Sequence, residues 1–442
     1  MVRLHRLILG ELVSFGCASV VLPRLGCFSV EDFALHASRT MVNVEGEALS
    51  ELPLMLMLVV GQHGVLHCRH LYCRQVCDQT VHRSIMTDLP VETYPRATLI
   101  DFTQRYLRRL GATEDEASIV ADGVVTAAAR WHPGKGQGLE KLFRLTEQCE
   151  CGGIVPGAPF EIVRETPATA FVDAHKGFGY VSAQRAMRMA IAKAEQVGLG
   201  GVLVRHSNHY GQAGYHAETA ARAGMLGMVM TNALAEMAPW GATEAVLGTN
   251  PWGLAIPRGE QFPIVLDMAL TMSGQGMIRW AFREGRSVPD NWALTPDGRR
   301  STNPAEFLSP DGSKPRGTQL PIGEFKGYGM SLFTDVLTGV LSGSLFGTNV
   351  FTDVTNHDVG HWVMAINPTT FMLPDEFQAR LAELVHQVRS AAPIQPGGRV
   401  YLPGEMEFER EEATALSGIP IDRATVVRLR QLAADRQVAC PL

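Results

Sequence analysis

The stretch Gly200-Gly-Val-Leu-Val-Arg-His-Ser-Asn-His-Tyr-Gly-Gln-Ala-Gly-Tyr215 decides how the middle of this chain folds. Its first six residues form a β-branched apolar run, which is typical of a buried strand. Small and apolar residues at helical spacing then run from Ala213 to Ala223 and stop at Gly224, a residue type that commonly ends a helix. The polar cluster between the two lies on a strand-to-helix turn, where α/β proteins bind ligands beside the N–H groups of a helix start.

Segments further along the chain repeat this arrangement of an apolar run that ends in polar residues. Residues 225–232 read as a strand that ends at Asn232, and the turn Gly248-Thr-Asn-Pro251 leads into a second strand at 252–257. A third apolar run, 262–267, stops at the carboxylate of Asp267. We expect these polar ends to meet at one site.

The elements on both sides of this region predict the fold class. Two consecutive amphipathic helices, about 97–110 and 113–129, form a helical N-terminal subdomain, and Thr113-Glu-Asp-Glu116 is a capping box. Strands and helices then alternate, which predicts an α/β core with a mixed or largely parallel sheet. No Gly-x-Gly-x-x-Gly motif follows a strand, so the pattern does not support a Rossmann fold.

The later part of the chain continues this alternation. We expect helices at about 271–284, 326–345 and 375–391, a strand at 362–366, and an exposed excursion rich in Pro, Gly, Ser and Asp at 285–319.

Composition excludes several classes of protein. The net charge of −6 and the pI near 6.2 do not favour nucleic-acid binding. The longest apolar stretch, Leu52 to Val60, is too short to span a bilayer. Glu11 interrupts the apolar start, which argues against a secretory signal, and eight cysteines in a chain of this length fit reduced thiols. We therefore expect a cytoplasmic protein with neither a nucleic-acid nor a membrane partner.

Residues 1–93 differ in composition from the rest of the chain. They contain no lysine but five of the eight cysteines. A zinc site built from His67, Cys68, His70, Cys73 and Cys77 is one interpretation, but the paired C-x₂-C units of structural zinc sites are missing, so we expect no metal. The alternatives are a poorly ordered extension, or an upstream segment read into the chain from a misplaced start.

Several ordered motifs carry a resemblance to a known family. They are Ser207-Asn-His209, Thr231-Asn232, Gly248-Thr-Asn-Pro251, Leu266-Asp-Met-Ala269 and Lys326-Gly-Tyr-Gly329. Together they resemble the malate/L-lactate dehydrogenase family that is unrelated to Rossmann-type lactate dehydrogenases, in order from about Tyr94 to about Glu412. The resemblance implies a homodimeric oxidoreductase that interconverts a small 2-hydroxy acid and a 2-keto acid with NAD or NADP, on a mixed-sheet, non-Rossmann fold.

The resemblance also implies three catalytic residues. Family members carry Ser-His-Gly followed by an arginine, with the histidine as acid/base; here His132 inherits that role, although Trp131 replaces the serine. Lys141 stands at the arginine's position when Gly138 is aligned with the family glycine. His209 is the second candidate for the acid/base, because an unperturbed histidine titrates near neutral pH. Asp267 would orient a histidine or act as base, whereas its structural alternative is a helix N-cap before Met268.

Further residues are implied as cofactor contacts. Neutral donors suited to amide, ribose or carbonyl groups come from the strand ends, and a lysine at a helix start suits a phosphate. The set comprises Asn232, Thr249, Asn250, Asp267, Met268, Ala269, Lys326, Gly327, Gly404 and Glu405. The neutral donors could instead be turn formers, and Lys326 a surface lysine. The choice between NAD and NADP stays open at this point, as does the substrate.

We divide the chain into an atypical extension at 1–93, a helical subdomain at 94–165 that joins the catalytic part, and a cofactor-binding α/β core at 166–360. A C-terminal segment at 361–442 is expected to pack back on the helical subdomain.

Two other functions remain: a cofactor-binding pseudoenzyme or regulatory protein, suggested by the altered Ser-His-Gly motif, and a cyclic-imine reductase. The glycine-rich residues 132–138 are interpreted as a flexible loop, since their spacing matches no phosphate-binding fingerprint.

Overall fold

The computed structural model describes residues 14–15, 18–19, 91–130, 138–353, 355, 357–394 and 397–442. The chain divides into two units, Met1–Val81 and His82–Leu442. In the first, the short strands β1 (Ser14–Phe15) and β2 (Ala18–Ser19) pair antiparallel. The proposed His67–Cys77 cluster lies outside the described residues. All further description concerns the second unit.

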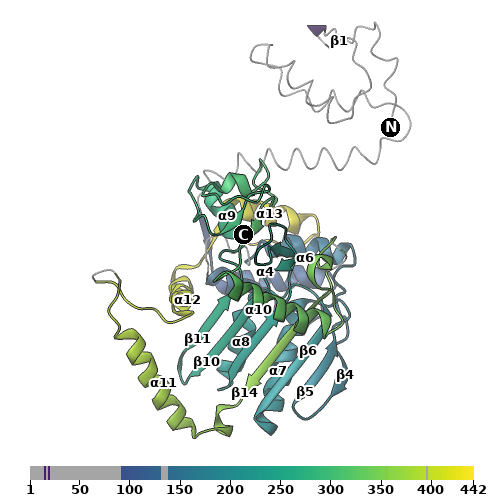
Figure 1. The fold of residues 1–442 in the computed structure, drawn as a ribbon. Helices are drawn as coiled ribbons and strands as arrows, with labels where there is room; N and C mark the ends of the chain where they lie inside the picture. The colour runs from purple at the N-terminus through teal and green to yellow at the C-terminus, as the bar shows by residue number, and fades with distance from the viewer. Residues whose placement is uncertain are drawn as a thin grey trace. The chain divides into compact units, whose positions relative to one another are not determined.

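A seven-stranded sheet organises the second unit, with the strand order β11-β10-β7-β14-β6-β5-β4 (Figure 1). Only β5 and β6 run parallel, and every other neighbouring pair is antiparallel. Of the two predicted alternatives, a mixed sheet and a largely parallel sheet, the sheet is therefore the mixed one. Its strands are β4 (Glu161–Glu165), β5 (Thr169–Asp173), β6 (Leu199–Ser207), β7 (Leu226–Thr231), β10 (Trp252–Arg258), β11 (Gln261–Met268) and β14 (Val359–Ile366).

Two helices cover one face of this sheet. They are α7 (Gly179–Val197), which ends at the left-handed Gly198, and α8 (Ala213–Arg222). Alanines dominate the buried side of both helices, so the helices pack closely against Val202, Val229 and Val363 of the sheet. This close packing brings the first turn of α8 against β10 and β11, where Gly253 and Gly214 leave room for the backbone.

Gly200 in β6 illustrates how tight this packing is. A Cβ at this position would lie 1.9 Å from the carbonyl oxygen of Ala190 in α7. Because backbone cannot yield as a flexible side chain does, we predict that Gly200→Ala lowers the free energy of unfolding by about 3 kcal/mol or more. Urea denaturation measures this difference. The matched control is Gly329→Ala, at a helical position with no atom within 4 Å; it should be neutral or slightly stabilising. Equal midpoints for the two variants would contradict the prediction.

The helical subdomain has its own core. It contains α4 (Arg96–Arg109), α5 (Glu114–Ala129) and α6 (Lys141–Glu150). The capping box at the start of α5 is confirmed, because Thr113 and Glu116 each accept a hydrogen bond from the other's backbone N–H. The C-terminal strand β15 (Ile419–Asp422) pairs with β3 (Val91–Tyr94), and α13 (Arg423–Ala434) contributes Val426 and Leu429 to the same core.

A smaller four-stranded sheet, in the order β12-β13-β8-β9, lies beyond the ends of the large one. It is formed by β8 (Ala235–Met237), β9 (Leu247–Gly248), β12 (Ala293–Leu294) and β13 (Thr318–Gln319), with α9 (Gln275–Arg283) and the 3₁₀ turn Pro304–Phe307 nearby. The expectation of a merely exposed excursion at 285–319 was wrong, since Val288, Ala293, Phe307 and Leu308 form a buried cluster with α9.

The remaining helices complete the second unit. The expected helix at 326–345 is α10 (Phe325–Asp335) followed by a π-helical segment, Val336–Val340. Two short 3₁₀ turns, Gly347–Asn349 and Pro368–Thr370, flank β14, and α11 (Pro374–Arg389) and α12 (Glu405–Ser417) follow. Figure 1 shows α11 standing apart from the sheet, beyond β11. No helix within the described ranges is long and apolar enough to cross a bilayer.

Candidate functional site

The turn between β6 and α8 places His209 at the end of the sheet. Gly211 has a φ of +82°, and a Cβ there would lie 2.3 Å from the ring of Tyr180, so only glycine fits. Tyr210 is buried between the rings of His216 and His361, whose centroids lie 5.0 and 4.8 Å from its own. His216 also donates through Nε2 to the Tyr210 carbonyl at 2.7 Å. The ring contacts and this hydrogen bond thus fix the position of the turn that carries His209.

His209 itself is a neutral hydrogen-bond donor. The backbone N–H of Gly211 donates to its Nδ1 at 3.1 Å, so the neutral ring carries its proton on Nε2. Burial, and then the charges of Lys141 and Arg144, hold the pKa of His209 well below its usual value of 6.5. At neutral pH this side chain can polarise a carbonyl oxygen through Nε2–H without being ionised.

Asp267 lies under the first turn of α8. It is on β11, and a Cβ at Gly214 would lie 2.9 Å from the Asp267 Cβ. Burial and then the Asp267 charge hold the pKa of Tyr210, in the same turn as His209, well above its usual value. The alternative of a helix N-cap is wrong, because Met268 continues β11 and α9 is capped at Gly274.

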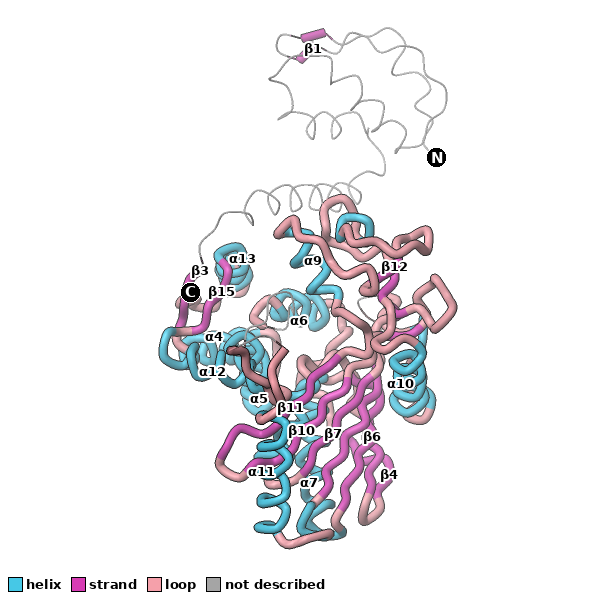
Figure 2. The backbone as a smooth tube through the Cα atoms, turned by 60° about the vertical axis from the view of Figure 1, so that its left-hand side comes forward, coloured by secondary structure: helices cyan, strands magenta, loops and turns pink. Residues whose placement is uncertain are grey.

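Two cationic side chains, Lys141 and Arg144, act on His209, and a third, Arg279, acts on Lys141. Lys141 and Arg144 come from α6, and Arg279 comes from α9; Figure 2 shows these two helices near the same end of the large sheet. Burial, with the charges of Arg144 and Arg279, lowers the pKa of Lys141 to about 8. The Nε of Arg279 is buried and has no hydrogen-bond partner within the described part of the chain. This cationic cluster of Lys141, Arg144 and Arg279 is suited to an anionic ligand.

Glu236 is a carboxyl group that interacts with the cationic cluster. It projects from β8, between Ala235 and the fully buried Met237. Burial raises its pKa to about 7, although the charges of Arg279 and Arg144 act in the opposite direction. Glu236 therefore changes charge near neutral pH, and its charge interacts with those of Arg144 and Arg279.

Two of the expected cofactor contacts are occupied by the protein itself. Asn232 donates through Nδ2 to the Leu345 carbonyl at 2.6 Å, and its Oδ1 accepts from the Gly360 N–H. Asn250, at a φ of +36°, donates to the Ser331 carbonyl and hydroxyl and accepts from the Ala233 N–H. Both amides join backbone segments that are far apart in the chain, so they support the site structurally.

Other expected contacts remain accessible. Thr249, Met268 and Ala269 are partly exposed, and Lys326 is exposed in the first turn of α10. The N–H groups of Lys326 and Gly327 already bond the carbonyls of Gly323 and Ile322. A phosphate contact at this turn would therefore come from the lysine ammonium and the open helix surface. Accessible donors and a cation at a helix start are what a nicotinamide dinucleotide requires, so the residue set fits this group.

The Pro403-Gly404-Glu405 turn borders a cleft of about 410 Å³. Gly404 packs on the backbone of Val265, two residues before Asp267. The Glu405 carboxylate accepts from the Leu402 N–H at 2.8 Å and pairs with Arg389 at 2.6 Å. The charged residues lining the cleft are Arg258, Arg389, Glu260, Glu405, Glu409 and Glu412, a carboxylate excess.

His132 lies outside the described residues, so its proposed role as acid/base stays a prediction. The sequence pointed to His209, Asp267 and Lys141 but missed Arg144, Arg279 and Glu236. Arg144 could have been found, since it follows Lys141 by one helical turn. Arg279 and Glu236 carry no such signal, because only the tertiary fold brings α9 and β8 to this place.

Comparison with known proteins finds relatives that cover most of this chain. The profile of a family described as malate/L-lactate dehydrogenase matches residues 94–430. A malate dehydrogenase of Pyrococcus abyssi is 36% identical over 77% of this chain and 93% of its own length. An L-sulfolactate dehydrogenase of Methanocaldococcus jannaschii is 34% identical over 74% of this chain and 92% of its own length. The crystal structure of Pyrococcus horikoshii malate dehydrogenase superposes with a TM-score of 0.71 at 32% identity, over 80% of this chain and 98% of that one.

Proposed function

The chain belongs to the malate/L-lactate dehydrogenase family, and on this basis we propose that it transfers a hydride between a nicotinamide cofactor and a small 2-hydroxy or 2-keto acid. The observation that carries the proposal is the neutral Nε2–H of His209 beside Lys141 and Arg144 of the cationic cluster. A donor held next to cations can polarise a keto group while the cations hold the substrate carboxylate. His132 supplies and removes the hydroxyl proton in this proposal.

The cationic cluster favours a substrate with two anionic groups. Lys141, Arg144 and Arg279 lie near Glu236, which is largely neutral below pH 7, while Glu140 and Glu147 offset part of the charge of Lys141 and Arg144. A second anionic group on the ligand would balance more of the remaining positive charge than a single carboxylate does. A 2-hydroxy acid with a second carboxylate or a sulfonate is therefore preferred over lactate. The names of the malate and sulfolactate dehydrogenase relatives agree with this preference.

The cofactor is proposed to lie along β11 and the start of α10, within the core at 166–360. Thr249, Met268, Ala269 and Lys326 would contact it, and the cleft beside Gly404 and Glu405 would take its adenosine end. When bound, the nicotinamide supplies or accepts the hydride. The carboxylate excess of that cleft favours the 2′-hydroxyl of NAD over the 2′-phosphate of NADP.

A panel of substrates with both cofactors tests the proposal. We expect oxidation of NADH by keto acids that carry a second anionic group, slower oxidation by pyruvate, and weaker use of NADPH. A cyclic imine 2-carboxylate is included as the alternative substrate class. Cofactor binding seen by nicotinamide fluorescence, without turnover of any member of the panel, would contradict the proposal and favour the pseudoenzyme.

We also propose a homodimer, because one face of the large sheet is left partly open. The side opposite α7 and α8 carries a continuous set of half-buried apolar residues: Leu226, Met228, Leu254, Ile256, Ile264, Leu266, Trp362, Met364 and Ile366. Monomers rarely expose apolar patches of this extent, and a second copy related by two-fold symmetry is the usual cover.

Light scattering checks the homodimer, with a twofold larger mass expected for the wild type. Ile256→Arg, on the open sheet face, should shift the protein toward the monomer. The matched control is Leu416→Arg on α12, where the leucine is 93% exposed; it should remain dimeric. A wild-type monomer at micromolar concentration would contradict the homodimer and leave the catalytic proposal untouched.

Glu236 predicts a specific pH dependence. Below its pKa of about 7 the carboxyl is neutral and does not offset the charge of the cationic cluster; above that pH the carboxylate forms and weakens anion binding. The KM for an anionic keto acid should therefore rise about 3- to 10-fold between pH 6 and 8. Glu236→Gln should keep the low KM across this range. If the KM of Glu236→Gln rises by the same factor between pH 6 and 8 as that of the wild type, the titrating group is Lys141, whose pKa is about 8.

A further inference from the structure

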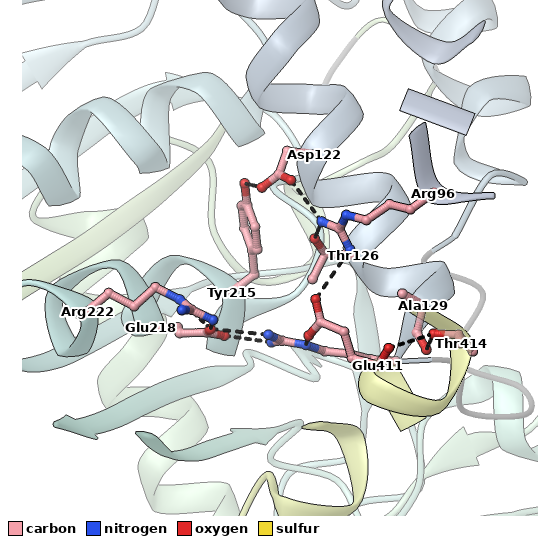
Figure 3. A network of polar contacts seen from close by, with 10 residues as sticks. Arg96, Asp122, Thr126, Ala129, Tyr215, Glu218, Arg222, Glu411 and Thr414 are labelled. Carbon is pink, nitrogen blue, oxygen red and sulfur yellow. Dashed lines mark hydrogen bonds and ion pairs between the residues drawn. The ribbon is translucent and has the colours of Figure 1, made fainter. Parts of the chain in front are cut away.

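A network of charges built around the buried pair Arg130–Glu218 joins the helical subdomain to α8 and α12. Figure 3 shows this polar network, with residues from α4, α5, α8 and α12 directed toward one another. Arg130, at the C-terminal end of α5, is its centre and is only 6% exposed. Its guanidinium donates to both oxygens of Glu218 on α8, at 2.6 and 3.1 Å, and through Nε to Glu411 on α12 at 2.7 Å.

The rest of the network reinforces the same junction. Tyr215 on α8 donates to Asp122 on α5 at 2.7 Å, and Arg96 on α4 bridges Asp122 and Glu411 at 2.9 and 3.3 Å. Thr414 on α12 donates to the Ala129 carbonyl at 3.1 Å. Three arginines, counting Arg222, balance three carboxylates, so the network is neutral.

Such a network sets geometry more than it adds stability. Buried ion pairs often contribute no more than well-packed apolar residues would, whereas the planar guanidinium admits only one arrangement of its partners. Tyr215 and Glu218 are three residues apart on the same side of α8, so α5 holds this helix at two points. A helix is stiff over this length, and its first turn begins four residues after His209 and packs against Asp267.

We propose that Arg130 is a positioning residue which, through Glu218, holds α8 and the His209 turn in register with the strand that carries Asp267. The same guanidinium, at the C-terminal end of α5, also bonds α12, which starts at the Gly404-Glu405 turn. The His209 turn and the Gly404-Glu405 turn thus adjoin helices that share one buried side chain. The inference rests on the proposed dehydrogenase function for its effect on turnover.

The test removes the charges in a balanced way. Arg130→Met combined with Glu218→Met deletes the pair and leaves Glu411 with Arg96. Arg130→Lys keeps the charge but cannot contact both carboxylates in a fixed plane. The matched control deletes another ion pair of α5, the exposed contact of 2.7 Å between Asp115 and Arg185, through Asp115→Met with Arg185→Met.

We expect the Arg130/Glu218 double variant to melt within a few degrees of the wild type and to bind NADH within about twofold of it. Its kcat should nevertheless fall about 10- to 100-fold, because a misplacement of about 1 Å at the reacting groups costs this much. Arg130→Lys should lie between the two, and the control should match the wild type. A double variant that melts normally and keeps the wild-type kcat would overturn the inference. So would a loss of kcat that only follows lost thermal stability, in either variant.

Hydrogen exchange separates this inference from the proposed function. Peptides that cover residues 204–214 should exchange faster in the double variant and in Arg130→Lys than in the wild type or the control, whether or not any substrate turns over. Should the wild type prove inactive, the proposed function fails while the exchange data still decide the positioning role. Unchanged exchange in 204–214 would end the inference even in an active enzyme.

Discussion

Replacing His209 with alanine is expected to lower kcat/KM for a 2-keto acid by about 10²- to 10³-fold. Loss of a single donor to a developing oxyanion has a cost of this size, and the Nε2–H of His209 is such a donor. Because it helps to hold the ground-state carbonyl as well, KM should rise while kcat falls. Steady-state kinetics with saturating cofactor measure both effects.

The pH profile gives His209→Ala a second readout. With a pKa well below 6.5, His209 stays neutral from pH 6 to 9, so the variant should lose rate without losing any step in the pH profile of the wild type. His209→Gln, which restores an N–H donor, should recover part of the loss. The control is His206→Ala near the end of β6, where the half-exposed ring binds Asp173 and not the cationic cluster. If a titration step of the wild-type pH profile is missing in His209→Ala, His209 is the group that titrates.

Replacing His132 with alanine should lower kcat and kcat/KM together, by about 10²-fold or more, and leave NADH affinity nearly unchanged. The lost interaction is a proton transfer that exists mainly in the transition state, and general acid/base catalysis contributes about 10²- to 10⁴-fold. One limb of the wild-type pH profile should disappear with it. Added imidazole should restore part of the rate if the missing group is a proton carrier.

The two histidine variants decide the assignment between them. His175→Ala serves as a control for His132→Ala, since this ring pairs with Glu161 at the surface. If His132→Ala keeps nearly full turnover while His209→Ala abolishes it, the roles reverse, and Asp267 becomes the partner that orients His209. Rescue by imidazole in His209→Ala alone would point the same way.

The sequence predicted the local elements of the site because their signals lie within a few residues. The apolar run before His206, the small residues after Ala213 and the final Gly224 were enough to place His209 on a strand-to-helix turn, as observed in β6 and α8. The capping box at Thr113 was predicted in the same way, since both of its partners lie within four residues.

The roles of Asn232 and Asn250 could not be predicted from the residues next to them in the sequence. Asn232 and Asn250 end strands in positions that suit a ligand, yet their amides bond Leu345, Gly360 and Ser331. Those partners lie roughly 80 to 130 residues away in the chain. A side-chain amide has the same chemistry whether it meets a ribose or a backbone carbonyl, so only the fold reveals which one it serves.

By itself, the sequence determined the family, the α/β class, the turn that carries His209 and the strand that ends near Asp267, because hydrophobic period, glycine positions and motif order are properties of short segments. The tertiary structure alone decided that β14 lies between β7 and β6, that Arg144 acts on both His209 and Glu236, and that Arg130 joins α5 to α8 and α12. These outcomes depend on contacts between distant segments, whose burial and charge are set only when the packed sheet brings them together.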